Sequence, residues 1–436
     1  MNKKTKMFAM ALTSIMTMSI FAGCSPKTNQ QQGKDEPKKE VKLTIWHYLN
    51  DREALLKEMA SSYEKKTGVK IDLQLYSGDQ MKAKVQAAAQ AKSLPDAWVF
   101  AGGKNELMKY ASAGSVLNLN DQGMKDWASR FNEGIISQVT ATDEDSKVEE
   151  SKGVIPGIYG VPLDVNNMQF LYNKDLFTKA GLDPNSPPKT WNEFIEVGKK
   201  LKAANIIPFA TGIGSWVQYS LTEQYQYAYM DKQKLIDSRN GKISYKDAGM
   251  EKVLNMIAEM RDAKLFAEGV ATMDLPVAEQ MFVNGQVAMI YDGSWAVGVF
   301  NSMNPNFKNY GVFLPPKDER ATNDVRIPGG IGAYLVASKD SKNAKETVAF
   351  LKWLTEKEQQ VLYSNQSFNL PANKEAVDPT KLLPQTAEFA KQMDKIQYAI
   401  PGYKGNITEL YGKGIQMIVI GKKTPADIVK EMDTSK

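Results

Sequence analysis

Aromatic, amide, acidic and glycine residues gather at the ends of several short apolar runs in this sequence. The run "NGQVAMI" leads directly into "YDGSW" at residues 291–295, and "VKLTIW" leads into "WHYLND" at 46–51. The stretches 95–105, 162–167 and 211–216 have the same character. Aromatic rings can stack on the apolar C–H faces of a sugar ring, while amides and carboxylates accept hydrogen bonds from its hydroxyl groups. The pattern therefore indicates a binding site for a hydroxyl-rich ligand.

The lack of arginine at these strand ends argues against an anionic ligand. Recognition of a phosphate usually uses arginine side chains, whose planar fork matches the oxyanion. The chain has six arginines, and none lies in the five stretches. In open α/β sheets ligands bind beyond the carboxyl ends of the strands, so the five stretches can converge on one site. An uncharged polyol fits that site better than an anion.

Each candidate residue also has a purely structural interpretation. Asn50, Asp292 and Ser294 are of the types that cap helix N-termini, and Asn50 is well placed to do so. Glycines can serve a turn, and a single tryptophan is commonly part of a core. The candidates open to these two interpretations are Trp46, Trp216, Trp295, Gly329 and Gly330.

The scarcity of histidine and cysteine removes most catalytic chemistry. One histidine, His47, and one cysteine, Cys24, cannot supply a serine or cysteine triad or a zinc site. The glycine stretches at 101–104 and 328–334 lack the spacing of a phosphate-binding loop, so no cofactor is expected. A glycosidase stays possible, because a chain with 50 Asp and Glu residues can place two carboxylates beside a sugar.

The N-terminus has the pattern of a secretory signal. A basic stretch, "MNKKTK", precedes seventeen uncharged residues that end before Cys24. We interpret residues 1–23 as a lipoprotein signal peptide, because "FAGC" resembles the motif in which the cysteine thiol is acylated, for example with palmitate. Residues 24–40 are polar and read as a flexible tether. Removal of the signal lowers the net charge from +5 to about +2, which is too balanced for a nucleic-acid partner.

The elements expected from hydrophobic periodicity alternate between strands and helices. A strand at 41–46, a helix at 51–68 and a strand at 69–75 come first, with Asn50 and Glu53 as a capping box and Gly68 as the helix stop. This order predicts an α/β fold with a parallel sheet. Further strands are expected at 97–100, 168–172, 206–210, 286–291 and 332–338, and one long helix at 342–363.

The ordered set of segments resembles a known family. The segments are "LTIWHYLND", "GVKIDLQL", "SLPDAWVF", "YGVPLDVNNMQFLYNKDLFTKAGLDP", "PKTWNEF", "FVNGQVAMIYDGSW", "PGGIGAYLVAS" and "ETVAFLKWLTEKEQQ". Together they are similar to the family 1 extracellular solute-binding proteins, the sugar-capturing lipoproteins of ATP-binding-cassette importers. The resemblance covers roughly residues 41–429.

The resemblance implies a two-lobe periplasmic-binding-protein-like fold of type II, with a hinge that the chain crosses several times. It divides the chain into an N-terminal lobe, 41–166 plus 312–368, and a C-terminal lobe, 167–311 plus 369–430. It implies a non-catalytic, monomeric receptor that captures an oligosaccharide and delivers it to the permease subunits of an ABC importer. In Gram-positive bacteria lipid on Cys24 would hold such a receptor at the extracellular face of the cell membrane.

The resemblance also adds candidate ligand contacts. Strand-end loops contribute most of them, and the loops around Trp216 and Tyr403 align less closely. Where maltose-binding members have a tryptophan and an arginine, this chain has Phe100 and "AGGKN", so a maltose-like ligand is not implied. The candidates carried over are Tyr48, Asn50, Asp51, Phe100, Lys104, Asp164, Asn166, Trp216, Asp292, Trp295 and Tyr403.

Three other functions stay open at this point. A sugar sensor on the same fold would signal to a kinase. A secreted carbohydrate-active enzyme would need two carboxylates across the ligand. A receptor for a polyamine or another polyol would set Asp164 and Asp292 against an aromatic box.

Overall fold

The computed structural model describes residues 40–124, 126–378, 380–397, 400 and 402–435. The predicted signal peptide 1–23, the predicted lipidation site Cys24 and all of the tether but its last residue lie outside these residues.

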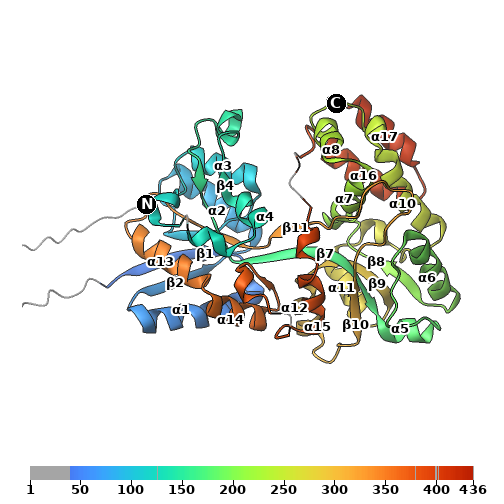
Figure 1. Ribbon diagram of the computed structural model, residues 1–436, viewed down its shortest axis with the longest axis horizontal. Helices are drawn as coiled ribbons and strands as arrows, with labels where there is room; N and C mark the ends of the chain where they lie inside the picture. Colours follow the sequence, from blue (N-terminus) through green and yellow to red (C-terminus); the bar gives the residue numbers. More distant parts are fainter. Residues whose placement is uncertain (1–39, 125, 379, 398–399, 401, 436) are drawn as a thin grey trace, which may run out of the picture. The chain divides into compact units, whose positions relative to one another are not determined.

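A first sheet has the strand order β2-β1-β3-β12-β6. Its strands β1 and β2 are labelled on the left in Figure 1. Strand β1 is parallel to both of its neighbours, and β12 returns antiparallel from much later in the chain. The strands are β1 (Lys42–His47), β2 (Lys70–Leu75), β3 (Ala97–Val99), β6 (Val161–Pro162) and β12 (Tyr334–Ala337). The helices of this half are α1 (Glu53–Thr67), α2 (Gly78–Gln90), α3 (Lys104–Ser112), α4 (Glu133–Ile136), α13 (Ala344–Leu354) and α14 (Lys357–Ser367), and a small pair is formed by β4 (Thr140–Ala141) and β5 (Gly157–Ile158).

A second sheet has the order β10-β7-β9-β8. Strand β9 is parallel to β8 and antiparallel to β7. Its strands are β7 (Asp164–Asn173), β8 (Ile207–Ala210), β9 (Val287–Gly293) and β10 (Tyr310–Phe313). Its helices are α5 (Lys174–Lys179), α6 (Trp191–Ala203), α7 (Val217–Tyr229), α8 (Lys232–Arg239), α9 (Tyr245–Ala248), α10 (Met250–Asp262), α11 (Leu275–Val283), α12 (Ala296–Met303), α15 (Pro384–Ala390), α16 (Ile407–Val419) and α17 (Pro425–Thr434).

Strand β7 joins the two halves. Its first residues pair with two short strands, β11 (Gly329–Ile331) and β13 (Leu370–Pro371), and its later residues pair with β9 and β10. The predicted crossing at 166/167 lies within β7, and the one at 368/369 lies just before β13. The predicted crossing at 311/312 falls inside β10, which pairs with β7 in the second sheet. The chain therefore returns to the first half later than expected, at β11.

The first helix ends as predicted but begins differently. Gly68 has a φ of 79° and its N–H bonds to the carbonyl of Glu64, so a left-handed glycine stops α1. The predicted capping box is wrong, because Asn50 starts a short 3₁₀ turn and α1 begins after Arg52 without a side-chain cap. The side chain of Arg52 is used elsewhere, as described below.

The long helix expected at 342–363 is two helices, α13 and α14. The break at Thr355 and Glu356 releases backbone carbonyls that side chains then satisfy. Asn373 donates to the carbonyl of Thr355 at 2.9 Å, and Gln360 donates to the carbonyl of Leu354 at 3.1 Å. Trp127 donates to the Thr355 hydroxyl at 2.9 Å. Hydrophobic periodicity continues across the break, so it could not reveal these long-range partners.

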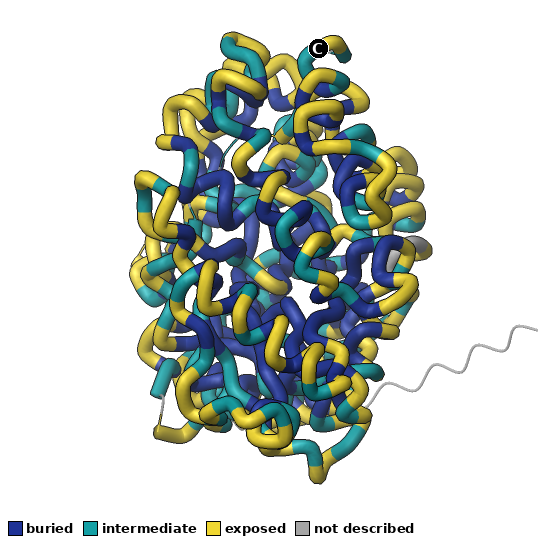
Figure 2. Tube along the Cα trace, turned by 90° about the vertical axis from the view of Figure 1, so that its right-hand side faces the viewer, coloured by how far each residue is buried: buried dark blue, intermediate teal, exposed yellow. Residues whose placement is uncertain are grey.

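Figure 2 shows buried segments in the interior and exposed segments at the surface. Every residue of β9 is buried, which is expected of a strand covered on both faces. Within the described residues, no helix has both the length and the apolar character that a membrane span needs.

Candidate functional site

Two tryptophans meet beyond the ends of β8 and β9. These strands are parallel, so their carboxyl ends lie at one edge of the second sheet. The rings of Trp216 and Trp295 have centroids 5.8 Å apart and are inclined by 48°. Trp216 is 52% exposed, whereas Trp295 is half-buried and packs against the core of this half. Two adjacent aromatic faces, one of them open to solvent, form a platform on which a sugar ring can stack.

A buried acidic pair supports this platform. Asp292 and Ser294 have no exposed surface, so neither side chain faces solvent. One Asp292 oxygen accepts a hydrogen bond from the Gly293 N–H at 2.7 Å, and Glu279 lies close enough to interact with the carboxyl group. Burial, followed by the Glu279 charge, raises the pKa of Asp292 well above its usual value. The proposed hydroxyl contacts of Asp292 and Ser294 stay predictions.

Gly293 sets the position of the platform ring. The ring of Trp295 lies so close to Gly293 that a β-carbon there would collide with it. A glycine at this position is therefore a steric requirement of the site.

The end of β1 and the loop after it contribute two exposed candidates and two packed ones. Asn50 and Asp51 are exposed, and Tyr48 is half-buried. Trp46 is 8% exposed and packs edge-on against Tyr76, with centroids 5.8 Å apart. Burial raises the pKa of Tyr48, so its hydroxyl remains a hydrogen-bond donor at neutral pH.

The candidates after β3 divide between core and cavity. Phe100 is buried and stacks on Tyr334, with centroids 5.6 Å apart. Lys104 is the first residue of α3, and its ammonium group lies 2.9 Å from the Asp145 carboxylate. Burial acts to raise the pKa of Asp145, but hydrogen bonds from Lys104 and Thr142 outweigh it and the pKa is lowered. The positive charge of Lys104 is therefore balanced within the protein.

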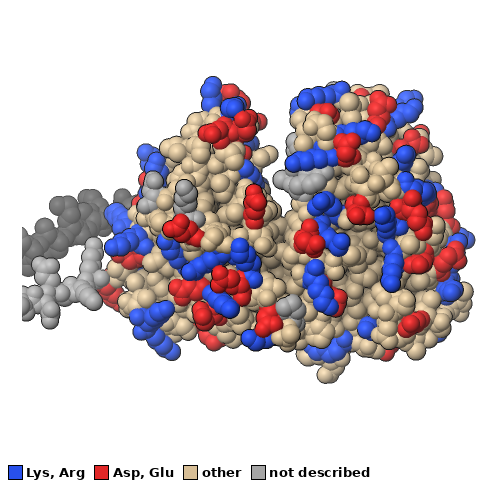
Figure 3. All heavy atoms as spheres, in the orientation of Figure 1, with Lys and Arg blue, Asp and Glu red and all other residues tan. Residues whose placement is uncertain are grey.

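A cavity of about 520 Å³ lies between residues of the two halves, and the surface is hollowed there in Figure 3. We call it the main cavity. The predicted residues Lys104 and Gly329 line it. Trp216, Glu223 and Tyr227 are spaced by seven and four residues along α7, which puts them on one face of that helix. Glu223 and Tyr227 line the main cavity, so α7 connects the cavity with the tryptophan platform. Its other lining residues include Asn105, Glu106, Gln138 and Gln397.

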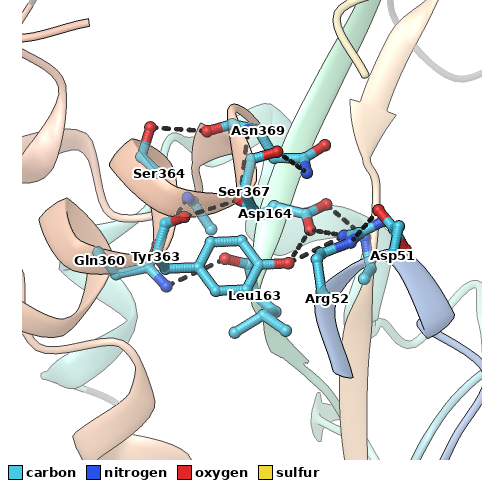
Figure 4. A network of polar contacts seen from close by, with 11 residues as sticks. Asp51, Arg52, Leu163, Asp164, Gln360, Tyr363, Ser364, Ser367 and Asn369 are labelled. Atoms are coloured by element: carbon cyan, nitrogen blue, oxygen red, sulfur yellow. Dashed lines mark hydrogen bonds and ion pairs between the residues drawn. The ribbon is translucent and has the colours of Figure 1, made fainter. Parts of the chain in front are cut away.

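The Asp164 carboxylate is already bonded to other side chains of the protein (Figure 4). Its carboxylate forms an ion pair with Arg52 and accepts hydrogen bonds from the Tyr363 hydroxyl at 2.6 Å and from the Ala333 N–H at 2.8 Å. With three protein donors and a side chain only 3% exposed, it has little capacity left for a ligand. Its neighbour Asn166 is half-buried and lies opposite Gly330 in the β7–β11 pairing.

Tyr403 lies within the second half. The guanidinium of Arg239 sits 3.2 Å from the centre of its ring, and Gln226 donates to its hydroxyl at 3.3 Å. A contact of Tyr403 with ligand stays a prediction.

Sequence reasoning named Lys104 and Gly329 but missed other residues that line the main cavity, among them Gln138, Glu223, Tyr227 and Gln397. Glu223 and Tyr227 had a usable signal, since their spacing from Trp216 is helical. Gln138 lies in a short 3₁₀ helix and Gln397 in an irregular segment, and no local pattern distinguishes either of them.

Two sheets joined by crossing strands, with a polar cavity between them and an aromatic pair at the edge of the second sheet, are the arrangement of a two-lobe binding protein. Comparison with known proteins agrees: residues 48–361 match the model of the bacterial extracellular solute-binding protein family. The chain belongs to this family.

The relatives differ in the ligands that they are named for. The chain is 24% identical over 381 residues to the sn-glycerol-3-phosphate-binding periplasmic protein UgpB of Brucella abortus, covering 85% of this chain and 82% of that one. Among solved structures, a chitin oligosaccharide binding protein matches with a TM-score of 0.72 at 25% identity, over 91% of this chain and 98% of that one. Maltose-bound MalE3 of T. maritima matches with a TM-score of 0.70 at 20% identity, over the same 91% and 98%. These structures share the two-lobe periplasmic-binding-protein fold, and the family consists of binding proteins.

Proposed function

We propose that this protein is an extracytoplasmic receptor that captures an oligosaccharide between its two lobes and delivers it to an ABC importer. The observation that carries the proposal is the Trp216–Trp295 platform, with one ring 52% exposed, in a molecule that also has a polar cavity between its halves. A stacked ring contributes about 0.5–1.5 kcal/mol beyond the burial of its area. The chemistry of this site is binding, not catalysis.

The charges of the main cavity favour an uncharged ligand. Lys104 is paired with Asp145, Glu106 is paired with Lys82 at 3.6 Å, and burial raises the pKa of Glu223. A phosphate such as that of sn-glycerol-3-phosphate would meet these carboxylates without a free arginine fork among the described lining residues. Neutral hydroxyl groups can instead donate to the carboxylates and to the amide oxygens.

The same proposal covers the location and the partners of the protein. A signal peptide ending at residue 23 and lipid on Cys24 would hold it on the outer face of the cell membrane of a Gram-positive bacterium. Two or three acyl chains make such anchoring stable. The receptor would act as a monomer and dock on the permease subunits of its importer.

A titration tests the proposal. Protein expressed from Ser25 onward is titrated by calorimetry with xylo-, chito- and malto-oligosaccharides, and separately with glycerol-3-phosphate and spermidine. We expect saturable binding of an oligosaccharide at about micromolar concentration, near −8 kcal/mol, and an unchanged sugar after long incubation. Binding of only glycerol-3-phosphate or spermidine would contradict the oligosaccharide ligand, and cleavage of the sugar would contradict a pure receptor.

A further inference from the structure

A second cavity, of about 700 Å³, adjoins the main cavity. We call it the side cavity. One wall comes from α4 and the residues that flank it, including Asn132, Gly134 and Ser137, and the other from Arg326 and the segment 390–397. None of the residues singled out from the sequence lines it.

The two cavities share two glutamines. Gln138 and Gln397 belong to the lining of both. Gln138 accepts a hydrogen bond from the Ile331 N–H at 3.3 Å, and the Gln397 N–H donates to the carbonyl of Ile327 at 3.0 Å. Both glutamines are thus held by the segment that contains β11, and the cavities meet along this segment.

The junction offers a buried acceptor. The Gln397 side-chain oxygen is buried and has no hydrogen-bond partner among the described residues. Leaving such a group without a partner costs about 1–3 kcal/mol, so a ligand hydroxyl that reaches it gains a favourable contact.

The side cavity has a different lining from the tryptophan platform. It has amide, hydroxyl and charged groups together with Ile135 and Met393, and no aromatic side chain among its described lining residues. A sugar unit there would be held by hydrogen bonds and would lack a stacking partner. Each cavity alone is within the range of a whole small-ligand pocket, roughly 300–1,000 Å³. One monosaccharide cannot fill both.

We propose that the side cavity binds additional units of a longer saccharide whose first units occupy the main cavity and the tryptophan platform. This inference rests on the proposed function and extends it, because it makes the ligand a chain that runs past Gln138 and Gln397. Affinity should therefore increase with chain length beyond the units that the main cavity holds.

The chain offers a matched pair of blocking variants. A β-carbon added at Gly134, in the side cavity, or at Gly103, in the main cavity, meets nothing within 4 Å, and neither glycine has a positive φ. Gly134→Trp should fill the side cavity, and Gly103→Trp should obstruct the main one. Ser137→Trp is a second block of the side cavity if Gly134→Trp fails to fold.

The experiment measures affinity by calorimetry for each oligosaccharide series, from disaccharide to hexasaccharide. In the unmodified protein we expect the affinity to rise about tenfold or more between short and long chains, which is about 1.4 kcal/mol. Gly134→Trp should abolish this rise and leave the shortest bound saccharide unchanged, whereas Gly103→Trp should weaken all chain lengths. Equal affinity at every length, or a rise that survives both side-cavity blocks, would overturn the inference and leave the receptor function standing. No binding by any saccharide would overturn both.

Discussion

Replacement of Arg52 by glutamine tests the polar network of Figure 4. Arg52 forms an ion pair with Asp164, donates to the Tyr363 hydroxyl at 2.8 Å and bonds to Asp51 at 2.9 Å. The side chains of Arg52 and Asp164 are 13% and 3% exposed, so the ion pair is largely removed from water. Glutamine keeps part of the volume and removes the charge.

The expected loss of stability follows from this burial. Removing one partner of a buried ion pair costs about 3–5 kcal/mol, because the other charge is left uncompensated. Asp164 keeps two donors, Tyr363 and the Ala333 N–H, so we expect a loss near the lower end, about 3 kcal/mol. Tyr363→Phe removes one hydrogen bond to the carboxylate and should cost less, about 1.5–3 kcal/mol.

The loss should depend on pH in a defined direction. Burial raises the pKa of Asp164, and the Arg52 charge is the largest influence that lowers it. Without Arg52 the folded-state pKa rises further above the unfolded value of about 3.9. A raised folded pKa means that stability falls as pH increases from the unfolded pKa to the folded one. The deficit of Arg52→Gln should therefore be large at neutral pH and shrink toward pH values near 4.

Native-state hydrogen exchange can measure this loss of stability separately in each half of the molecule. We expect faster exchange at the amides of β1 and β3, with β8 and β9 in the second sheet as the internal control. Arg52→Lys, which keeps a charge but loses the fork, should recover part of the protection. An equal loss in both sheets, or a deficit that stays constant toward acid pH, would refute the reasoning.

Three further predictions concern the site. Trp295→Ala should weaken oligosaccharide binding about tenfold or more in calorimetry, since it removes stacking worth about 0.5–1.5 kcal/mol together with buried contact area; an unchanged affinity would exclude the platform. Asp292→Asn should make the thermal midpoint depend less steeply on pH, because burial raises the pKa of both Asp292 and Glu279, such groups lose stability as pH rises, and Asp292 no longer titrates in the variant; a profile as steep as that of the unmodified protein would contradict the acidic pair. Gly330→Ala should destabilise the protein by about 1–3 kcal/mol, because Gly330 has a φ of 149° and its β-carbon would collide with Gln138; an unchanged unfolding midpoint would show that β11 tolerates the substitution.

Most of the fold could be predicted from local patterns. The apolar runs at 97–100, 206–210 and 286–291 correspond to β3, β8 and β9, because a short buried strand has a continuous apolar sequence. The very short strands β11 and β13 could not be predicted, because each exists only through pairing with β7. The same limit explains the late return of the chain to the first sheet.

The candidate site was predicted less completely than the fold. Reasoning from strand ends named Trp216 and Trp295, which the structure brings together, because parallel strands present their carboxyl ends at one edge. Asp164 was named as a ligand contact, but its partners Arg52 and Tyr363 are 112 and 199 residues away in sequence. No local pattern reveals that a carboxylate is already satisfied by such distant donors.

The pairing of β7 indicates where the two halves can move. Its residues Val165–Asn167 pair with β11, and its residues from Met168 onward pair with β9. Asp164, just before them, is fixed to the first half by Arg52, so the strand cannot bend there without breaking the buried ion pair. The two sets of partners overlap at Asn167 and Met168, because the Ser294 N–H donates to the Asn167 carbonyl and the Met168 N–H donates to the Pro328 carbonyl. A closing motion of the two halves is therefore not confined to the bond between these two residues. A ligand drives such closure only through contacts that it makes better in the closed form. A ligand that contacts the exposed Asn50 and Asp51 of the first half and also the tryptophan platform of the second meets this condition. It can make both sets of contacts only when the two halves close around it.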